Sequence, residues 1–201
     1  MKSDKLDGKV AVVTGASKGI GAGIAREFAE AGASVIVNYV SAKQDADRVV
    51  DEIIKRAGKA VAIQGSVAKK TEVEKLFTEA EKGFGKIDIL VNNAGVYEFV
   101  LLEEVTEQQF HRMFDTNVLG TILATQEALK HFNPAGGSII NIGSLASVLT
   151  PPTGVVYNAT KAAVGRHHAD AGKGTWGAQD PGERNQARYG DHRRSDYRRI
   201  S

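Results

Sequence analysis

The chain has 201 residues, of which 42% are hydrophobic, and this suits one domain with a buried core. It contains no cysteine, which excludes disulfides and thiolate metal sites. Residues 1–164 carry 18 Lys and Arg against 19 Asp and Glu, whereas residues 165–201 carry 8 against 5. No long apolar run precedes the first predicted strand, so we expect a cytoplasmic protein without a signal peptide or membrane span.

As far as residue 164, short β-branched runs alternate with longer amphipathic segments. The short runs are predicted strands, at residues 9–14, 34–38, 60–64, 88–92 and 138–143. They are apolar throughout, which predicts that both faces of the sheet are covered. The predicted helices are residues 19–31, 42–57, 70–82, 107–131 and a helix that starts at about 154. This alternation predicts an α/β fold with a Rossmann-like, doubly wound parallel sheet.

The first strand leads directly into a glycine-rich turn, TGASKGIG, and then into a helix. Gly15 permits a tight turn, Gly19 lets the backbone approach a pyrophosphate, and Gly21 lets the helix pack against the strand. The helix N-terminus would present free N–H groups to the phosphates. Because the turn follows the first strand at once, a dinucleotide site is favoured over an ordinary strand–helix turn.

The end of the second predicted strand indicates which dinucleotide binds. NAD sites usually place an acidic residue there to hold the ribose 2′-hydroxyl. This strand ends in Asn38 and Tyr39, with Ser41 beyond, and no carboxylate is present to repel a 2′-phosphate. Lys18, inside the glycine turn, can supply positive charge to that phosphate. The sequence therefore favours NADP(H), with use of NAD(H) as well left open.

Tyr157 and Lys161 are four positions apart, so on a helix they share one face. A lysine ammonium beside a phenol stabilises the phenolate. Tyr157 could then exchange the proton that accompanies hydride transfer. On its own this spacing is common and is more often a surface feature.

Three further motifs occur in order: NNAG at residues 92–95, Asn117 within FDTNVLG, and Ser144 thirteen residues before Tyr157. Together with the glycine turn and the Tyr–Lys pair, they resemble the short-chain dehydrogenase/reductase family over roughly residues 7–164. The resemblance is to the branch that contains 3-oxoacyl-carrier-protein reductases and glucose 1-dehydrogenases. Five motifs in the family's order make chance agreement unlikely.

The resemblance implies a role for each matching residue. Tyr157 would be the general acid/base, Ser144 would bond the substrate oxygen, and Lys161 would bind the nicotinamide ribose. Asn117 would hold a water that links Lys161 to solvent. The implied catalytic residues are Asn117, Ser144, Tyr157 and Lys161. The implied cofactor-binding residues are Gly15, Ser17, Lys18, Gly19, Ile20, Gly21, Asn38, Tyr39, Ser41, Ser66, Val67, Asn93, Ala94, Gly95, Tyr157 and Lys161.

One position departs from the family pattern. Relatives usually carry an Asp–Val pair whose Asp bonds the adenine amine, whereas this chain has Ser66 and Val67. A serine can still accept that bond, but without charge assistance. We expect a modest loss of cofactor affinity and the same reaction.

The expected function is hydride transfer between NADP(H) and a carbonyl/alcohol pair: a 3-oxoacyl thioester, a ketone or a sugar. Substrate-facing candidates are Val96 to Phe99 and Leu145 to Pro152, whose mostly apolar character argues against a highly polar substrate. No metal is implied, and relatives form homo-oligomers. The alternative is a catalytically inert nucleotide-binding fragment of such an enzyme.

After Val164 the family pattern stops. Residues 165–201 contain no Val, Leu, Met or Phe, and hold seven Gly and Pro and seven of the chain's eleven arginines. Such a stretch buries too little apolar surface to fold, so we expect low order there. A nucleic-acid-binding tail is another interpretation, but no reader motif or aromatic platform supports it.

A shift of reading frame near Gly165 is our preferred explanation of this tail. Back-translation with selected codons, read one base later, converts residues 165–176 into the amphipathic sequence DAITQTLAKELG. Residues 185–191 become IKPGMV, similar to a family turn that contacts the nicotinamide amide. The domain is then predicted at residues 1–164, ending after the fifth strand and the start of the next helix, with 165–201 as a non-family tail.

Overall fold

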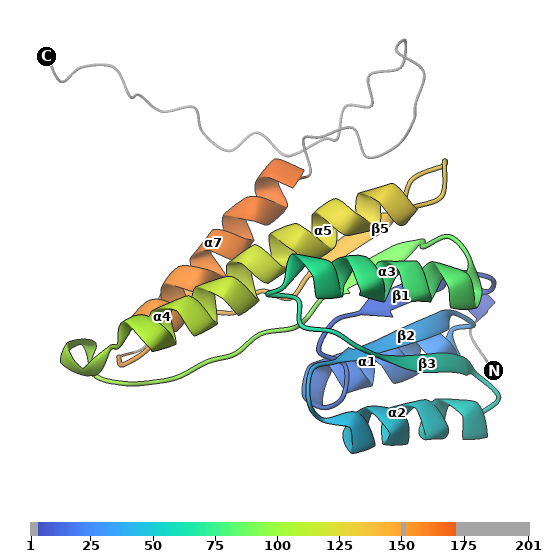
Figure 1. Cartoon of the computed structure of the whole chain (residues 1–201), viewed down its shortest axis with the longest axis horizontal. Coiled ribbons are helices and arrows are strands. Elements are labelled where there is room, and N and C mark those ends of the chain that lie inside the picture. The colour runs from blue at the N-terminus through green and yellow to red at the C-terminus, as the bar shows by residue number, and fades with distance from the viewer. Residues whose placement is uncertain (1–3, 150–151, 172–201) are drawn as a thin grey trace, which may run out of the picture.

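The computed structural model describes residues 4–149 and 152–171 (Figure 1). Five parallel strands form one sheet in the order β3-β2-β1-β4-β5. The strands are β1 (Val10–Val13), β2 (Ser34–Tyr39), β3 (Lys59–Gln64), β4 (Ile89–Asn92) and β5 (Ser138–Asn141). The predicted Rossmann-like α/β fold is confirmed, and each predicted strand lies within three residues of its observed bounds.

Helices connect the strands and cover both faces of the sheet (Figure 1). The α-helices are α1 (Gly19–Glu30), α2 (Lys43–Lys55), α3 (Lys70–Phe84), α4 (Glu107–Phe114), α5 (Gly120–His131), α6 (Ala146–Leu149) and α7 (Val155–Ala171). Short 3₁₀ turns occur at η1 (Asp4–Leu6) and η2 (Leu102–Glu104), and a π-helical segment at η3 (Asp115–Leu119). None of the helices described is long and apolar enough to cross a bilayer.

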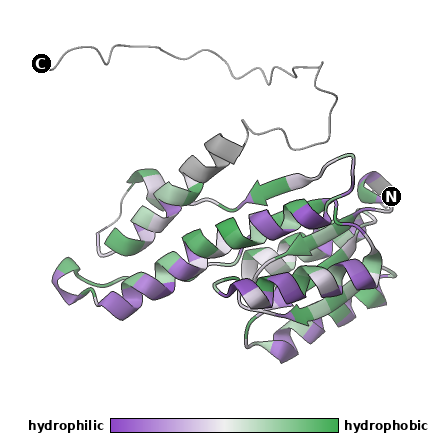
Figure 2. Cartoon of the chain, turned by 45° about the horizontal axis from the view of Figure 1, so that its top comes forward, coloured by the Kyte–Doolittle hydropathy of each residue, from purple (hydrophilic) through white to green (hydrophobic). Residues whose placement is uncertain are grey.

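The central strand β1 shows how the two faces are filled. Ala11 and Val13 belong to the core cluster with α1 and α2, whereas Val10 and Val12 belong to the cluster with α3 and α5. Side chains alternate along a strand, so consecutive apolar residues serve opposite faces. The hydrophobic faces of the helices turn toward the sheet, and polar residues lie outside (Figure 2). The continuous apolar run of this strand is therefore explained by burial on both sides.

The two edge strands differ from the expectation that all strands are covered. Val61 of β3 is 37% exposed and Ile140 of β5 is 40% exposed. Among the described strands, β3 pairs only with β2 and β5 only with β4. Apolar sequence alone does not distinguish an edge strand from a central one, because that depends on which neighbours the chain places beside it.

The predicted helix over residues 107–131 is one helical path with an irregular centre. Residues 115–119 take π-helical hydrogen bonding between α4 and α5, while Phe114, Asp115 and Gly120 keep α-helical φ and ψ. Such single-turn insertions are rare and often lie at functional sites. Here the insertion includes Asn117, one of the predicted catalytic residues.

Helix α7 continues to Ala171, seven residues beyond the predicted boundary at 164. Extending a helix that is already formed costs less than starting one, so glycine at 165 does not end it. The remaining tail predictions concern residues 172–201, which lie outside the described residues. Among the residues that the structure describes, β5 is the last strand, as predicted for residues 1–164.

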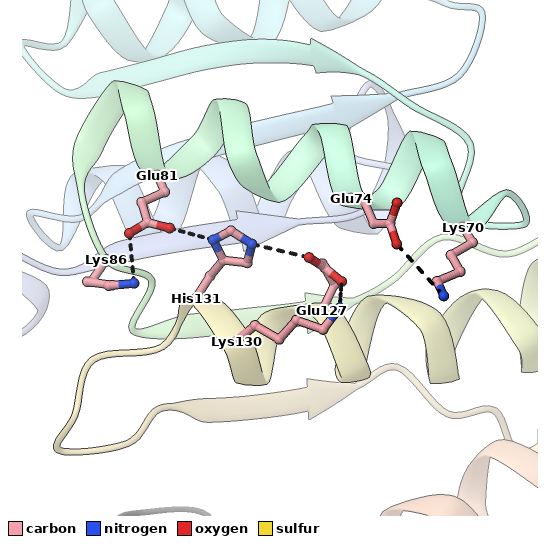
Figure 3. Close-up of polar contacts among 7 residues, drawn as sticks. All are labelled: Lys70, Glu74, Glu81, Lys86, Glu127, Lys130 and His131. Carbon is pink, nitrogen blue, oxygen red and sulfur yellow. Dashed lines mark hydrogen bonds and ion pairs between the residues drawn. The ribbon is translucent and has the colours of Figure 1, made fainter.

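A polar network ties the ends of α3 and α5 together (Figure 3). His131 Nδ1 lies 2.5 Å from Glu81 Oε2, and His131 Nε2 lies 3.2 Å from Glu127 Oε1. The outer members are Lys86, 2.7 Å from Glu81, and Lys130, 2.6 Å from Glu127. This network lies at the carboxyl end of α5, whereas Asn117 precedes the first turn of that helix.

Candidate active site

A cleft of about 710 Å³ lies where β1, β2 and β4 end. In doubly wound sheets, ligands bind outside the carboxyl ends of the strands where the strand order reverses, which here is between β1 and β4. Every predicted cofactor-binding residue except Gly21 lines this cleft: Gly15, Ser17, Lys18, Gly19, Ile20, Asn38, Tyr39, Ser41, Ser66, Val67, Asn93, Ala94, Gly95, Tyr157 and Lys161. Residues from five separate segments are thus brought to one cavity.

The glycine turn is built around Thr14, whose side chain is buried at the end of β1. Its hydroxyl donates to the Val91 carbonyl and accepts from the main-chain N–H groups of Asn93 and Ala94, at 3.0–3.1 Å. This brings the ends of β1 and β4 together. At Gly15, φ is +61°, and an added Cβ would lie 2.8 Å from the Ala94 Cα, so only glycine fits there.

The other two glycines of the turn behave differently. At Gly19, φ is +58° and no atom lies within 4 Å of an added Cβ, so its backbone faces open space in the cleft wall. At Gly21, an added Cβ would lie 2.4 Å from Asn93 Nδ2 and 2.7 Å from the Gly15 carbonyl. Gly21 therefore permits close packing behind the turn, as predicted, and does not line the cleft.

The N-terminus of α1 opens on this cleft without a side-chain cap. Lys18 stands at the N-cap position in an extended conformation and makes no side-chain capping bond. The first N–H groups of a helix have no partner inside it, so they are available to an anion. Lys18 is exposed and makes no ion pair with any described residue. Its ammonium is thus available beside the turn.

Asn38 occupies the position where NAD sites usually carry an acid, but its side chain is 1% exposed. Its Oδ1 accepts from the Gly15 N–H at 3.2 Å, and its Nδ2 donates to the carbonyls of Ile63 and Gly65. The amide thus braces the glycine turn against the end of β3 and is not available for a ribose contact. Beyond Asn38, residues 39–42 line the cleft at this strand end, among them the predicted Tyr39 and Ser41.

Ser66 and Val67 both line the cleft, as predicted. The Ser66 N–H donates to Glu72 Oε2 at 2.7 Å, and this bond, helped by Lys69, holds the pKa of the Glu72 carboxyl below its ordinary value. Val67 is buried against Gly120, where an added Cβ would lie 2.6 Å from Val67 Cγ2. The segment after β3 is thus tied to both α3 and α5.

Tyr157 and Lys161 lie one helical turn apart on α7, and both line the cleft. Lys161 Nζ is 5.9 Å from the centroid of the Tyr157 ring and donates to the Ile142 carbonyl at 2.9 Å. The lysine is 8% exposed, and this burial lowers the pKa of its ammonium. The predicted pairing of an ammonium with a phenol on one helix face is present.

Asn117 is 2% exposed and connects three elements. Its Oδ1 accepts from the Val96 N–H at 2.8 Å, and its Nδ2 donates to the Val96 carbonyl and to Thr160 Oγ1. Its own carbonyl accepts from Thr121 Oγ1 at 2.8 Å, a bond formed across the π-helical segment. The side chain therefore fixes the loop after β4 and the helix that carries Tyr157.

Of the four predicted catalytic residues, Tyr157 and Lys161 line the cleft, whereas Asn117 and Ser144 do not. The Ser144 hydroxyl accepts from the Ala146 N–H at 3.1 Å, and its carbonyl accepts from Ser147. This is the local side-chain-to-backbone bonding that serine favours at the start of a helix, here α6. Because Ser144 Oγ accepts in this contact, its own O–H remains free to donate to a substrate oxygen.

Eight residues that line the cleft were not predicted as catalytic or cofactor-binding, although two of them, Val96 and Tyr97, fall in the predicted substrate-facing segment. The eight are Val40, Ala42, Val96, Tyr97, Arg112, Thr116, Ile142 and Gly143. Phe99 packs beside Tyr157. Arg112 of α4 is ion-paired with Glu98 of the loop after β4. Thr116 lies in FDTNVLG beside Asn117, a signal that could have identified it, whereas no motif marks Tyr97, Phe99 or Arg112.

Comparison with known proteins places this chain among dehydrogenases. Residues 9–171 match the family model described as short chain dehydrogenase. An uncharacterized oxidoreductase of Methylorubrum extorquens is 54% identical over 160 residues, which are 80% of this chain and 64% of that protein. A probable tetrahydroxynaphthalene reductase of Zymoseptoria tritici is 42% identical over 81% of this chain and 61% of its own length.

A solved structure shares both fold and sequence. The short chain dehydrogenase from Burkholderia cenocepacia in complex with NADP superimposes with a TM-score of 0.79 at 37% identity, over 83% of this chain and 69% of that one. The chain spans less than two thirds of the length of the relatives compared by sequence.

Proposed function

We propose that this chain, which belongs to the short-chain dehydrogenase family, binds NADP(H) and transfers a hydride between it and a carbonyl/alcohol substrate. The observation that carries the proposal is that the glycine turn and the Tyr157–Lys161 pair line one cleft. A cofactor-sized cavity with a nucleotide turn at one end and a proton donor at the other is suited to this reaction.

The residues present fit a dinucleotide. Gly15 leaves no room for a Cβ, and the uncapped N-terminus of α1 offers N–H groups to phosphates. Lys18 would hold a 2′-phosphate together with Ser41, since Asn38 is committed to the backbone and no carboxylate lines this end of the cleft. Asn93, Ala94 and Gly95 would line the ribose side, with Ser66 and Val67 toward the adenine.

Proton transfer falls to the residues of α7. Hydride chemistry is what the nicotinamide supplies when bound. Tyr157 donates its phenolic proton to the substrate oxygen during reduction and takes it back during oxidation. Lys161, held by the Ile142 carbonyl, places a positive charge beside the phenol and stabilises its deprotonated form. Asn117 keeps α7 and the loop after β4 in register.

Three kinds of substrate are candidates for this reaction: a ketone, a sugar, or a 3-oxoacyl thioester such as 3-oxoacyl-carrier-protein reductases use. One relative is named for tetrahydroxynaphthalene, an aromatic compound, which supports the ketone class. A cytoplasmic location and assembly into a homo-oligomer are further parts of the proposal. The inert nucleotide-binding fragment is the second candidate, because Ser144, the expected contact to the substrate oxygen, does not line the cleft.

Isothermal titration of the chain with NADPH and NADH, followed by a ketone and alcohol panel, tests the proposal. We expect NADPH to bind more tightly than NADH, because a charge-assisted contact to the 2′-phosphate contributes about 1.5–3 kcal/mol. Binding without turnover supports the inert fragment, and a preference for NADH refutes the NADP(H) assignment.

We also propose that residues 165–201 are read in a shifted frame. The support is the composition of that stretch and the family-like sequence that its shifted back-translation yields. Sequencing the gene across the codons for residues 160–170 tests this directly. An uninterrupted frame that encodes the printed residues would refute it.

A further inference from the structure

Three aromatic side chains from two distant segments lie together at the catalytic end of the cleft. The Tyr157 ring is 6.1 Å from the Tyr97 ring and 5.9 Å from the Phe99 ring, centroid to centroid, with interplanar angles of 66° and 73°. The Tyr97 and Phe99 rings are 5.7 Å apart. Edge-to-face arrangements at these separations are the ones that aromatic rings favour. The proton donor is therefore bordered by two further rings.

Tyr97 and Phe99 lie in the loop after β4, where every second residue from 96 to 100 makes a hydrogen bond or ion pair to another part of the chain. Val96 bonds the Asn117 side chain through both its N–H and its carbonyl. Glu98 pairs with Arg112, and the Val100 N–H donates to the Thr153 carbonyl at 2.9 Å. Tyr97 and Phe99 lie between these anchors, and they are 66% and 51% exposed. The backbone thus holds two rings beside Tyr157 while leaving much of their surface available for contact.

Among the described residues, the cations that line the cleft besides Lys18 are Arg112 and Lys161. Arg112, on α4, is already paired with Glu98 of the segment that carries the two rings. Leu145, Val148 and Leu149 are 69–76% exposed in and next to α6, which packs on α7. Of the two cations, Arg112 is ion-paired with Glu98, so among the described residues Lys161 is the cation left to an anionic substrate here.

We propose that Tyr97 and Phe99 select neutral ketones in which a flat aromatic ring is fused to the ring that carries the reacting carbonyl. Tyr97 lines the cleft and would contact the substrate ring directly, whereas Phe99 supports Tyr97 and Tyr157 from beside them. This inference rests on the proposed function, because it names the substrate class for the same site. It narrows the open choice between thioester, ketone and sugar.

Two bicyclic ketones of similar size separate ring recognition from general apolar burial. 2-Tetralone has an aromatic ring, whereas 2-decalone is its saturated counterpart. Calorimetric titration of the 201-residue chain, saturated with NADP⁺, measures the affinity for each. We expect 2-tetralone to bind about five times more tightly, because aromatic pairs attract beyond their area burial.

Variants of Tyr97 and Phe99 test whether these two side chains cause the preference for 2-tetralone. Tyr97→Leu and Phe99→Leu should each weaken 2-tetralone binding by about three- to tenfold while changing 2-decalone binding by less than about twofold. Tyr97→Phe keeps the ring and should retain the affinity for 2-tetralone. Phe110→Leu is the matched control, because Phe110 stacks on Phe114 of α4 at 4.4 Å and does not line the cleft. Circular dichroism verifies that each variant is folded.

The outcomes distinguish the two proposals. Absence of NADP⁺ binding overturns the proposed function and this inference with it. Binding of NADP⁺ with equal affinity for the two ketones overturns the aromatic selection alone. Equal weakening of both ketones by Tyr97→Leu also overturns it, since that result would show apolar contact without ring recognition.

Discussion

β1 and β5 are parallel strands of one sheet, but they lie in different surroundings. All four residues of β1 are buried, and the strand pairs with β2 on one side and β4 on the other. In β5, exposed and partly buried residues alternate, and among the described strands only β4 pairs with it. The site spans both regions, so its nucleotide end rests on the core and its catalytic end on an edge.

The two ends are also held by different contacts. At the nucleotide end, Thr14 and Asn38 bond main-chain groups of segments that already pair in the sheet. At the catalytic end, two polar side chains position α7. Asn117 donates to Thr160 of this helix, and Lys161 of the helix donates to the Ile142 carbonyl after β5. Cofactor binding and chemistry should therefore be separable by mutation, which the following changes test.

The largest effect is expected for Tyr157→Phe, which removes the transferable proton and keeps the ring. Turnover by the frame-restored protein should fall about 10²- to 10⁴-fold, the usual contribution of general acid–base catalysis. The affinity for NADPH, measured by titration, should stay unchanged. Near-normal turnover in this variant would mean that another group supplies the proton.

Lys18→Ala probes the nucleotide end alone. Loss of one charge-assisted contact should weaken NADPH binding about tenfold, while NADH binding, which has no 2′-phosphate to lose, should hardly change. Titration of both cofactors gives the ratio. An equal loss for both would show that Lys18 acts on the pyrophosphate or the helix end and does not determine the choice of cofactor.

Asn117→Ala removes the tie at the catalytic end. It leaves the N–H and carbonyl of Val96 without their buried partner, and such unsatisfied groups cost about 1–3 kcal/mol. For a chain of this size, this lowers Tm by roughly 2–4 °C per kcal/mol. Asn133→Ala is a control, because the side chain of Asn133 makes a single bond, to Asp88, and its loss should lower Tm less.

Lys161→Met exchanges a buried ammonium for an apolar side chain of similar length. Burial lowers the pKa of Lys161, so the folded chain holds this proton less tightly than the unfolded chain does. Stability from this group therefore rises as the pH climbs from the folded pKa toward the ordinary value of 10.5. The variant should be more stable than the parent near pH 7, and this advantage should shrink toward alkaline pH. A lower Tm near pH 7 would show that the bond to Ile142 outweighs desolvation.

The smallest effect is expected for Glu81→Gln, in the polar network between α3 and α5 (Figure 3). Hydrogen bonds from Lys86 and then from His131 lower the pKa of Glu81. Its stabilising contribution is present above the ordinary carboxylate range and is lost as the pH falls through the lowered pKa. Thermal unfolding near pH 7 should show a small decrease in Tm that disappears in acid. Glu74→Gln, which removes the looser 3.9 Å pair with Lys70, should show less.

Much of this architecture could be predicted from the sequence, because it depends on local periodicity. The strands, the glycine turn from Thr14 to Gly21 and the four-residue spacing of Tyr157 and Lys161 are set by contacts within a few turns of chain. The predicted helix over residues 107–131 was correct in extent, but its π-helical segment was not foreseen. That irregularity accompanies a bond between Asn117 and Val96, 21 residues away.

Side-chain direction was decided by the tertiary structure alone. Asn38 lines the cleft as predicted, but its amide also bonds the glycine turn. Ser144 does not line the cleft, and its hydroxyl accepts from the Ala146 N–H. Tyr97 carries no motif, and only the packing of α7 beside the loop after β4 brings it to Tyr157. A single sequence reports which residues can form a helix or a strand, because those interactions are short in sequence. Which polar groups remain free for a ligand depends on the partners that the folded chain brings to them from elsewhere.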